Sequence, residues 1–358
     1  MSLDELRHKI DTEDDRIVKL IAGRIRQAQE IGQEKLKNGI QIVDTAREER
    51  VIEHVKEIAR QEKISEKYIE QIYRQVIQAS KSVQGIVVAF QGETGAYSEA
   101  AAFQYFGAEV LTQPRESFDA VFKAVEQAEV TYGVVPVENS LEGSIARVYD
   151  LFLNSALKVR GETELRVIHS LIANPGVTLD HVKRVYSHPQ ALGQAQAFLR
   201  QLNVEVVSTY DTAGSVRMIK EKNITDGAAV ASERAAEIYG MKILARQIED
   251  NPNNYTRFFI LSTQDSPPTG KDKTSIVFSV KHRPGALFAA MKDFADAGIN
   301  LTKIESRPTR QRAWEYNFYL DLEGHRMDKK VQDALKKLEE NALFLKVLGS
   351  YPRTVSNT

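Results

Sequence analysis

The 358-residue sequence contains no cysteine. This absence excludes disulfides, thiolate metal sites, iron–sulfur clusters and cysteine nucleophiles together. No stretch approaches the roughly 18 apolar residues that a membrane-spanning helix needs, and the opening run MSLDELRHKIDTEDD lacks the apolar core of a signal peptide. The formal net charge is −1, so no overall field attracts the chain to nucleic acid or to an anionic membrane. We therefore expect a cytoplasmic protein.

Length and composition indicate a globular protein with more than one domain. Hydrophobic residues make up 42% and charged residues 27% of the chain. A chain of this length exceeds what one core usually organises, so we expect two or three domains. The spacing of apolar residues changes along the chain and predicts four segments: all-helical 1–84, α/β 86–263, a linker at 264–272 (QDSPPTGKD), and α+β 273–352.

The first segment contains no proline, and its apolar residues recur at intervals of three and four. Ser2 and Glu5 form a capping box that opens a helix without a breaker before residue 38. That helix would be a rod of roughly 50 Å, at 1.5 Å per residue. Two shorter helices, 45–61 and 65–84, cannot cover its whole apolar stripe. We therefore expect this segment to pair with a second copy of the chain.

Cations occupy positions on or beside these apolar stripes. The residues concerned are Arg7, Arg24 and Lys35 on the first helix and Arg47 on the second, with polar Ser80 and Gln84 ending the third stripe. Buried cations are costly unless paired, and the nearby acids are few, mainly Asp44 and Glu48. A small dianionic ligand would balance these charges. The alternative is that the cations extend from the margins of the stripe into solvent.

This pattern resembles the all-helical chorismate mutases across residues 1–84. The resemblance implies an intertwined dimer in which Arg7 reaches the partner's site. The carboxylates of chorismate would be bound by Arg7, Arg24, Arg47 and Ser80. The ring hydroxyl would be held by Asp44 and Glu48, and the ether oxygen would accept hydrogen bonds from Lys35 and Gln84. A pericyclic rearrangement needs no nucleophile, only a substrate held in its reactive conformation and stabilisation of charge on the breaking ether bond.

In the second segment, short apolar runs such as IVVAF, TYGVVPV and TRFFILS mostly alternate with amphipathic helical stretches. This alternation predicts parallel sheets in an α/β domain, and its length suits two lobes with a cleft between them. Four loops follow strands and carry polar residues: Ser98, then Glu138, Asn139 and Ser140, then Ser187, His188, Gln190 and Gln194, then Asp211 and Thr212. Singly, each loop is explained by capping and turns, and His188 reads as a turn residue before proline. Together they favour a ligand cleft.

The run DNPNNYTRFFIL places Thr256 and Arg257 at the start of an apolar strand. With GETGAYSEAA, VPVENSLEGS and SHPQALGQ, it resembles prephenate dehydratase over residues 86–263. The resemblance implies two α/β lobes similar to a type 2 periplasmic binding protein. Thr256 would donate a hydrogen bond to the leaving hydroxyl, and the substrate would be surrounded by Ser98, Glu138, Asn139, Ser140, Ser187, Gln194, Thr212 and Arg257. Glu138 or water would supply the proton, and Arg257 would either bind a carboxylate or lock the loop.

The last segment shows the strand and helix order βαββαβ, which is the ferredoxin-like plan. Gly285, in RPGALF, opens a helix whose backbone N–H groups can bind a carboxylate. This run and the ESRP turn resemble the amino-acid-sensing ACT domain. The resemblance implies side-by-side pairing of two such domains and a phenylalanine site formed by Gly285, Ala286, Leu287, Glu305, Ser306, Arg307 and Pro308.

The three resemblances together imply a bifunctional chorismate mutase–prephenate dehydratase under feedback control by phenylalanine. We expect a homo-oligomer that needs no metal and no organic cofactor. Two alternatives remain open from the sequence. One is a non-catalytic amino-acid sensor, which would not need Arg24 or Thr256, and the other is a dehydratase that prefers arogenate.

Overall fold

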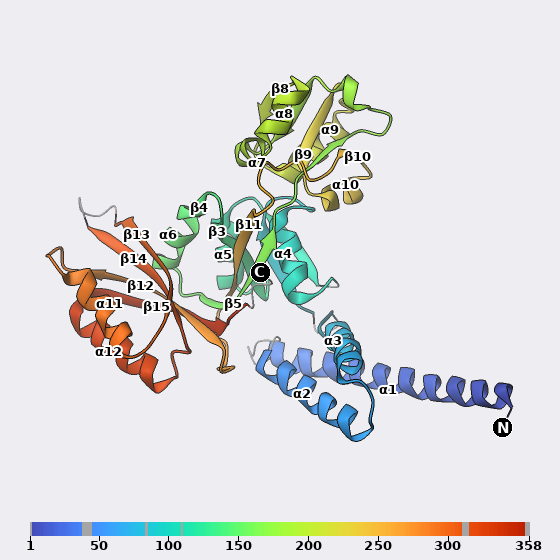
Figure 1. Ribbon diagram of the computed structural model, residues 1–358, viewed down its shortest axis with the longest axis horizontal. Coiled ribbons are helices and arrows are strands. Elements are labelled where there is room, and N and C mark those ends of the chain that lie inside the picture. Colours follow the sequence, from blue (N-terminus) through green and yellow to red (C-terminus); the bar gives the residue numbers. More distant parts are fainter. Residues whose placement is uncertain (1, 38–44, 83–84, 109, 310–314, 355–358) are drawn as a thin grey trace. The chain divides into compact units, whose positions relative to one another are not determined.

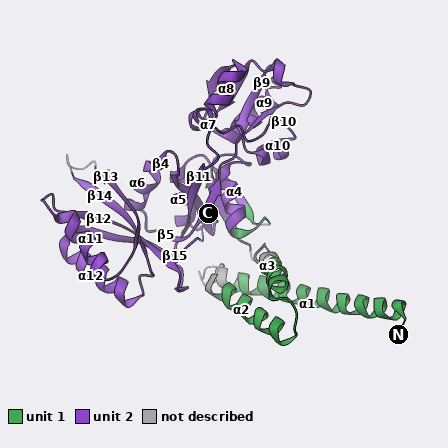
Figure 2. Ribbon diagram, viewed as in Figure 1, with its two compact units in different colours: residues 1–87, 106–111 green, residues 88–105, 112–358 purple. Residues whose placement is uncertain are grey.

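The computed structural model describes residues 2–37, 45–82, 85–108, 110–309 and 315–354 (Figure 1). The chain divides into two compact units, residues 1–87 with 106–111 and residues 88–105 with 112–358 (Figure 2). Within the described residues, no helix is long and apolar enough to cross a membrane.

The first unit is built from the three expected helices: α1 (Leu3–Lys37), α2 (Thr45–Gln61) and α3 (Glu66–Ser82). The expected capping box is present, because the backbone N of Glu5 donates to Ser2 Oγ at 3.2 Å and the backbone N of Ser2 donates to Glu5 Oε2 at 2.8 Å. Both α1 and α2 pack against α3, around a small core that includes Ala28, Ile52, Val55, Ala59 and Ile77.

The first half of α1 leaves its apolar side chains uncovered within one chain. Leu3 is 63% exposed, Ile10 is 61% exposed and Leu20 is 74% exposed. Contiguous apolar surface of this kind marks an interaction face.

The second unit begins with a two-lobed α/β region. The first lobe holds a six-stranded sheet in the order β2-β1-β3-β11-β5, with β4 paired to β3. Its elements are β1 (Val87–Gln91), α4 (Tyr97–Phe106), β2 (Leu111–Arg115), α5 (Phe118–Glu126), β3 (Tyr132–Asn139), β4 (Gly143–Ser144), α6 (Ala146–Asn154), β5 (Lys158–Arg166) and β11 (Tyr255–Ser262).

The second lobe holds a five-stranded sheet in the order β10-β6-β9-β7-β8. Its elements are β6 (Ser170–Ala173), η1 (Leu179–His181), β7 (Arg184–Ser187), α7 (Pro189–Gln194), α8 (Gln196–Leu202), β8 (Glu205–Ser208), α9 (Thr212–Glu221), β9 (Gly227–Ala231), α10 (Glu233–Tyr239) and β10 (Lys242–Ala245). Two apolar clusters, one including Leu171 and Val185 and the other Ile172 and Val216, form its core, and the second cluster also includes Phe90 of β1.

The expectation of parallel sheets holds for only part of each lobe. Strands β1 and β3 are parallel, as are β7 and its neighbours β8 and β9. Strand β11, by contrast, enters the first sheet between β3 and β5 and is antiparallel to both, because the chain returns from the second lobe in the opposite direction. This return sets Thr256 opposite Asn139 and Arg257 opposite Glu138.

The C-terminal part of the second unit has the expected βαββαβ order. Its elements are β12 (Asp272–Val280), α11 (Ala286–Asp296), β13 (Leu301–Pro308), β14 (Tyr316–Glu323), α12 (Lys329–Asn341) and β15 (Ala342–Pro352). The four strands form an antiparallel sheet in the order β13-β14-β12-β15, and both helices pack on one of its faces (Figure 1). The domain boundaries given above stay a prediction.

Candidate active sites and effector site

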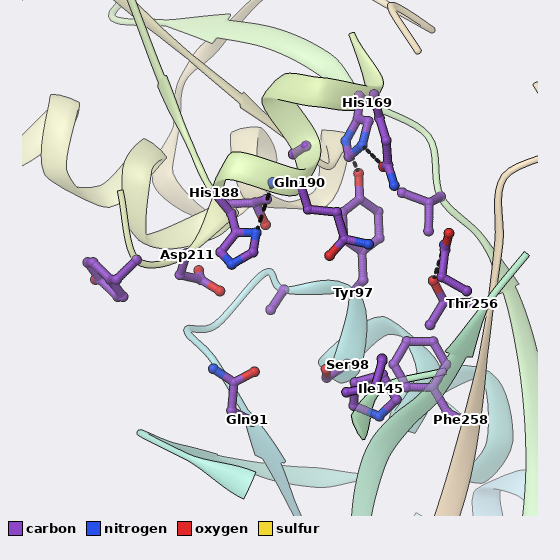
Figure 3. A pocket seen from close by; sticks show the side chains of 18 of the residues that line it. Gln91, Tyr97, Ser98, Ile145, His169, His188, Gln190, Asp211, Thr256 and Phe258 are labelled. Atoms are coloured by element: carbon purple, nitrogen blue, oxygen red, sulfur yellow. Dashed lines mark hydrogen bonds between the residues drawn. The ribbon is translucent and has the colours of Figure 1, made fainter. Parts of the chain in front are cut away.

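A cavity of about 320 Å³ lies between the two lobes of the α/β region (Figure 3). This volume is within the usual range for small-molecule sites. Both lobes contribute polar side chains to its lining, among them Tyr97, Ser98, Asn139, His169, Gln194 and Thr256.

The hydroxyl oxygen of Thr256 accepts a hydrogen bond from Asn139. Asn139 Nδ2 donates to Thr256 Oγ1 at 3.1 Å, while Asn139 Oδ1 accepts from the backbone N of Leu141 at 3.0 Å and of Glu142 at 3.1 Å. The two backbone donors fix the Asn139 amide, so its nitrogen has to face Thr256. Thr256 Oγ1 therefore acts as an acceptor toward the protein, and its own hydrogen remains available to a molecule in the cavity.

Buried amides extend this arrangement away from Thr256. Asn139 Nδ2 also donates to Asn254 Oδ1 at 2.7 Å, and Asn254 Nδ2 donates to Gln194 Oε1 at 2.9 Å. Gln194 Nε2 then donates to Glu142 Oε1 at 2.9 Å. Asn254 is completely buried, and the sequence analysis did not single it out. Its position in the run of amides just before Thr256 was the signal available.

His169 completes this network and was also missed, because it sits inside an apolar stretch that reads only as a strand. Its side chain is buried, with Nε2 2.9 Å from Gln194 Oε1 and Nδ1 2.9 Å from Tyr97 Oη (Figure 3). Burial lowers the pKa of His169. Burial likewise raises the pKa of the Tyr97 phenol well above its usual value.

Five residues that the sequence analysis assigned to substrate binding or catalysis line the cavity: Ser98, Asn139, Gln194, Thr212 and Thr256. Two expected serines do not line it. Ser187 is buried and donates to the carbonyl of Val230 at 2.6 Å. Ser140 Oγ accepts from the backbone N of Tyr255 at 2.9 Å and donates to the carbonyl of Asn253 at 2.9 Å. Both serines hold the backbone in place.

Glu138 and Arg257 also lie away from the cavity, because neighbouring residues in a strand point to opposite faces of the sheet. Arg257 donates from Nε to Glu162 Oε2 at 2.8 Å, from Nη1 to Asp321 Oδ2 at 2.6 Å and from Nη2 to Tyr351 Oη at 3.0 Å. Burial works against both charges of the Arg257–Asp321 pair. Even so, the pKa of Arg257 is raised well above its usual value, and that of Asp321 is lowered.

These contacts favour one of the two alternatives that the sequence leaves open for each residue. Arg257 is committed to carboxylates of the protein, so the geometry supports its locking role and not a contact with a substrate carboxylate. Glu138 Oε2 pairs with Lys303 Nζ of β13 at 2.8 Å and does not line the cavity. It is therefore badly placed to supply a proton beside Thr256.

Capping explains two other polar residues of the cleft, as the turn reading predicted. His188 is the N-cap of α7, and its Nδ1 accepts from the backbone N of Gln190 at 3.3 Å. Asp211 is the N-cap of α9, and its Oδ1 accepts from the backbone N of Gly214 at 2.7 Å.

In the helical unit, the structure brings two of the expected chorismate-binding residues together. Arg24 Nη1 donates to Ser80 Oγ and, at 3.3 Å, to the carbonyl of Val76. Arg7 lies 17 residues before Arg24 on the same helix, which corresponds to about 25 Å at 1.5 Å per residue, and its exposed side chain pairs with Asp4 at 3.6 Å. Arg7 and Arg24 therefore cannot reach one ligand within one chain.

The structure describes only some of the other residues expected at this site. Arg47 and Glu48 stand in the first turn of α2. Asp44 and Gln84 lie outside the described residues, and of Lys35 only the backbone within α1 is described.

The expected effector residues lie at two places in the C-terminal domain. Gly285 is the N-cap of α11 with a φ of 81°, a left-handed conformation that favours glycine, and Ala286 and Leu287 follow in the first turn. On β13, exposure alternates, so that Ser306 and Pro308 are exposed while Glu305 and Arg307 turn toward the first lobe. There Glu305 accepts from Ser144 Oγ, and Arg307 Nη2 lies 3.3 Å from Asp150 Oδ1.

Fold and sites together define a multidomain enzyme with a small-molecule cleft, a separate helical unit and a ferredoxin-like regulatory domain. Three family descriptions match the chain in the same order: chorismate mutase type II at residues 6–85, prephenate dehydratase at 88–266 and ACT domain at 274–340. The chain belongs to the family of bifunctional chorismate mutase/prephenate dehydratases.

Individual relatives agree with this assignment. A bifunctional chorismate mutase/prephenate dehydratase from Stutzerimonas stutzeri is 38% identical over 361 residues, covering 99% of this chain and 98% of that protein. An arogenate dehydratase/prephenate dehydratase from Arabidopsis thaliana is 48% identical, but covers 74% of this chain and 72% of the relative. The crystal structure of a prephenate dehydratase from Arthrobacter aurescens in complex with L-Phe superposes with a TM-score of 0.69 at 33% identity, covering 75% of this chain and 90% of that one.

Proposed function

We propose that the chain rearranges chorismate to prephenate in its helical unit and converts prephenate to phenylpyruvate in the cleft between its α/β lobes. The observation that carries the second assignment is the hydrogen bond from Asn139 Nδ2 to Thr256 Oγ1, which makes Thr256 an acceptor toward Asn139 and leaves its hydrogen available to a molecule in the cavity. Membership of the bifunctional family supports both activities and argues against the non-catalytic sensor.

Decarboxylative dehydration of prephenate needs help mainly where hydroxide departs. The bond to the ring carboxylate breaks and releases carbon dioxide, and its electron pair enters the ring as the bond to the ring oxygen breaks. Thr256 donates a hydrogen bond to that oxygen as negative charge develops on it. A threonine hydroxyl is too weak an acid to give up its proton, and Glu138 faces the other side of the sheet, so we assign the proton that converts hydroxide to water to solvent.

For the mutase, we propose that Arg24 and Ser80 bind one carboxylate of chorismate within the helical unit. Arg7 would serve the site of a second chain, since it is too far along α1 to serve its own. The exposed apolar residues of α1 support this dimer, because a second copy would cover them. The roles of Lys35, Asp44, Arg47, Glu48 and Gln84 stay as the sequence predicts them.

For regulation, we propose that phenylalanine binds at the start of α11, with its carboxylate on backbone N–H groups of the first helical turn. Side-by-side pairing of two ACT domains would complete the site, and Phe288 and Ile304, which are 71% and 51% exposed, support such an interface. The cytoplasmic location stays a prediction.

Phenylpyruvate formation from prephenate tests the dehydratase assignment directly. We expect turnover by the purified full-length chain and inhibition by added phenylalanine. Supplying arogenate in parallel decides the remaining alternative. A higher kcat/KM for arogenate would overturn the prephenate preference, and absence of turnover on both substrates would overturn the dehydratase assignment itself.

A further inference from the structure

We propose that His169 is a positioning residue of the dehydratase: its Nε2–H donates to Gln194 and thereby, together with the Glu142 carboxylate, holds the direction of the hydrogen bonds that end on Thr256. This inference rests on the proposed dehydratase function. His169 acts through other side chains, and its role is separate from that of the residues that contact the reacting bonds.

The side-chain amide of Gln194 can face only one way. Its Nε2 donates to Glu142 Oε1 at 2.9 Å, and a carboxylate group only accepts. Gln194 Oε1 therefore faces both Asn254 Nδ2 and His169 Nε2, each at 2.9 Å. Because this oxygen has no hydrogen to donate, His169 Nε2 has to carry one.

The other side of the imidazole ring is consistent with that tautomer. The Tyr97 hydroxyl lies 2.9 Å from His169 Nδ1 and 2.5 Å from the carbonyl oxygen of Ile168. A neutral ring with its hydrogen on Nε2 presents a lone pair at Nδ1. The hydrogen of the Tyr97 hydroxyl can then be shared between this lone pair and the carbonyl oxygen of Ile168. The two rings also pack edge to face, with centroids 5.7 Å apart. Both ring nitrogens are thus occupied, so His169 is not free to act as a general base.

The orientation of the Gln194 amide fixes which atoms donate and which accept in the hydrogen bonds that lead to Thr256. Asn254 donates to Gln194, so its oxygen faces Asn139, and Asn139 in turn donates to both Asn254 and Thr256. If the Gln194 amide turned over, Asn254 would have to turn as well. Its nitrogen would then meet the nitrogen of Asn139, which two backbone N–H groups hold in place. His169 opposes this reversal from the far end of the network.

Two substitutions of His169 separate the proposed donor from simple packing. The amide nitrogen of glutamine can take the place of Nε2, whereas that of asparagine reaches only the place of Nδ1. With prephenate as substrate, we expect His169→Gln to keep most of kcat and His169→Asn to lose roughly ten-fold or more, with little change in KM. Tyr97→Phe, which keeps the ring packing and the bond to Gln194, should cost less than His169→Asn.

A double-mutant cycle then tests whether His169 acts through Gln194. In a Gln194→Ala background, His169→Asn should add little further loss, because the bond that it removes is already gone. Equal losses in His169→Gln and His169→Asn, or additive losses in the cycle, would overturn the proposal. Denaturant unfolding followed in the second unit reports whether these variants are folded. Failure of the unsubstituted chain to convert prephenate would instead overturn the proposed function.

Discussion

At the scale of single residues, the cavity is organised by groups that can act only as donors or only as acceptors. The backbone N–H groups of Leu141 and Glu142 orient Asn139, and the Glu142 carboxylate orients Gln194. The sequence predicts Asn139, Gln194 and Thr256 as neighbours through the family resemblance. It does not predict His169 or Asn254, since their partnership with Gln194 spans 25 and 60 positions and depends on the return of β11.

Replacing Thr256 tests the role of its hydroxyl. Thr256→Ala should lower turnover of prephenate by roughly 10²–10³, the usual effect of removing one donor to a developing oxyanion. Thr256→Ser keeps the hydroxyl and should retain much of the rate. Steady-state kinetics with prephenate measure both variants. A near-normal rate for the alanine variant would mean that Thr256 only holds the end of the strand.

Replacing Arg24 tests the helical site in the same way. Arg24→Ala removes the charge partner of a buried substrate carboxylate, so chorismate turnover should be abolished, an effect of about 2–5 kcal/mol. Prephenate supplied directly should still be converted, because the cleft lies in the other unit. Chorismate turnover within a few-fold of the unsubstituted chain would show that the helical site is assigned to the wrong residues.

At the scale of elements, β11 has two functional faces. Thr256 points into the cavity, while Arg257, the next residue, joins the strand to Asp321 of β14 and Tyr351 of β15. The sequence leaves the role of Arg257 open. Strand alternation predicts that its side chain lies on the other face of the sheet from Thr256, but it does not predict which residues pack on that face. The residues that bind Arg257 there belong to the ACT sheet and lie more than 60 positions away in the sequence.

The stability of this contact can be measured. Arg257→Met would leave Asp321 buried without its charge partner and Glu162 with Lys273 alone, and breaking a buried pair in this way typically costs about 3–5 kcal/mol. Arg257→Lys keeps the charge but loses the planar fork, so a smaller loss is expected. Denaturant unfolding of the full chain, followed in the second unit, compares the two. Unchanged stability of Arg257→Met would contradict a structural role for this ion pair.

At the scale of the whole chain, the sequence predicts the order and type of the segments well, because each has its own apolar period. It predicts poorly how the ACT domain meets the dehydratase. Gly349 of β15 lies so close to β5 that an added Cβ would stand 2.1 Å from the carbonyl oxygen of Val159. On β13, Lys303 pairs with Glu138, the neighbour of Asn139, so β13 contacts the strand that carries the partner of Thr256.

A substitution at Gly285 tests the proposed effector site. Gly285→Val forces a β-branched residue into a left-handed conformation at the start of α11, so phenylalanine binding should weaken while basal activity stays. Calorimetric titration with phenylalanine and prephenate turnover measure the two effects. Undiminished inhibition in this variant would place the effector site elsewhere.

The most direct test of two separate active sites in one chain is to supply chorismate to Thr256→Ala at neutral pH and follow both products. Prephenate should accumulate at the rate of the unsubstituted mutase, while phenylpyruvate formation falls roughly 10²–10³. Phenylpyruvate produced at a near-normal rate, or loss of prephenate formation along with it, would contradict the account.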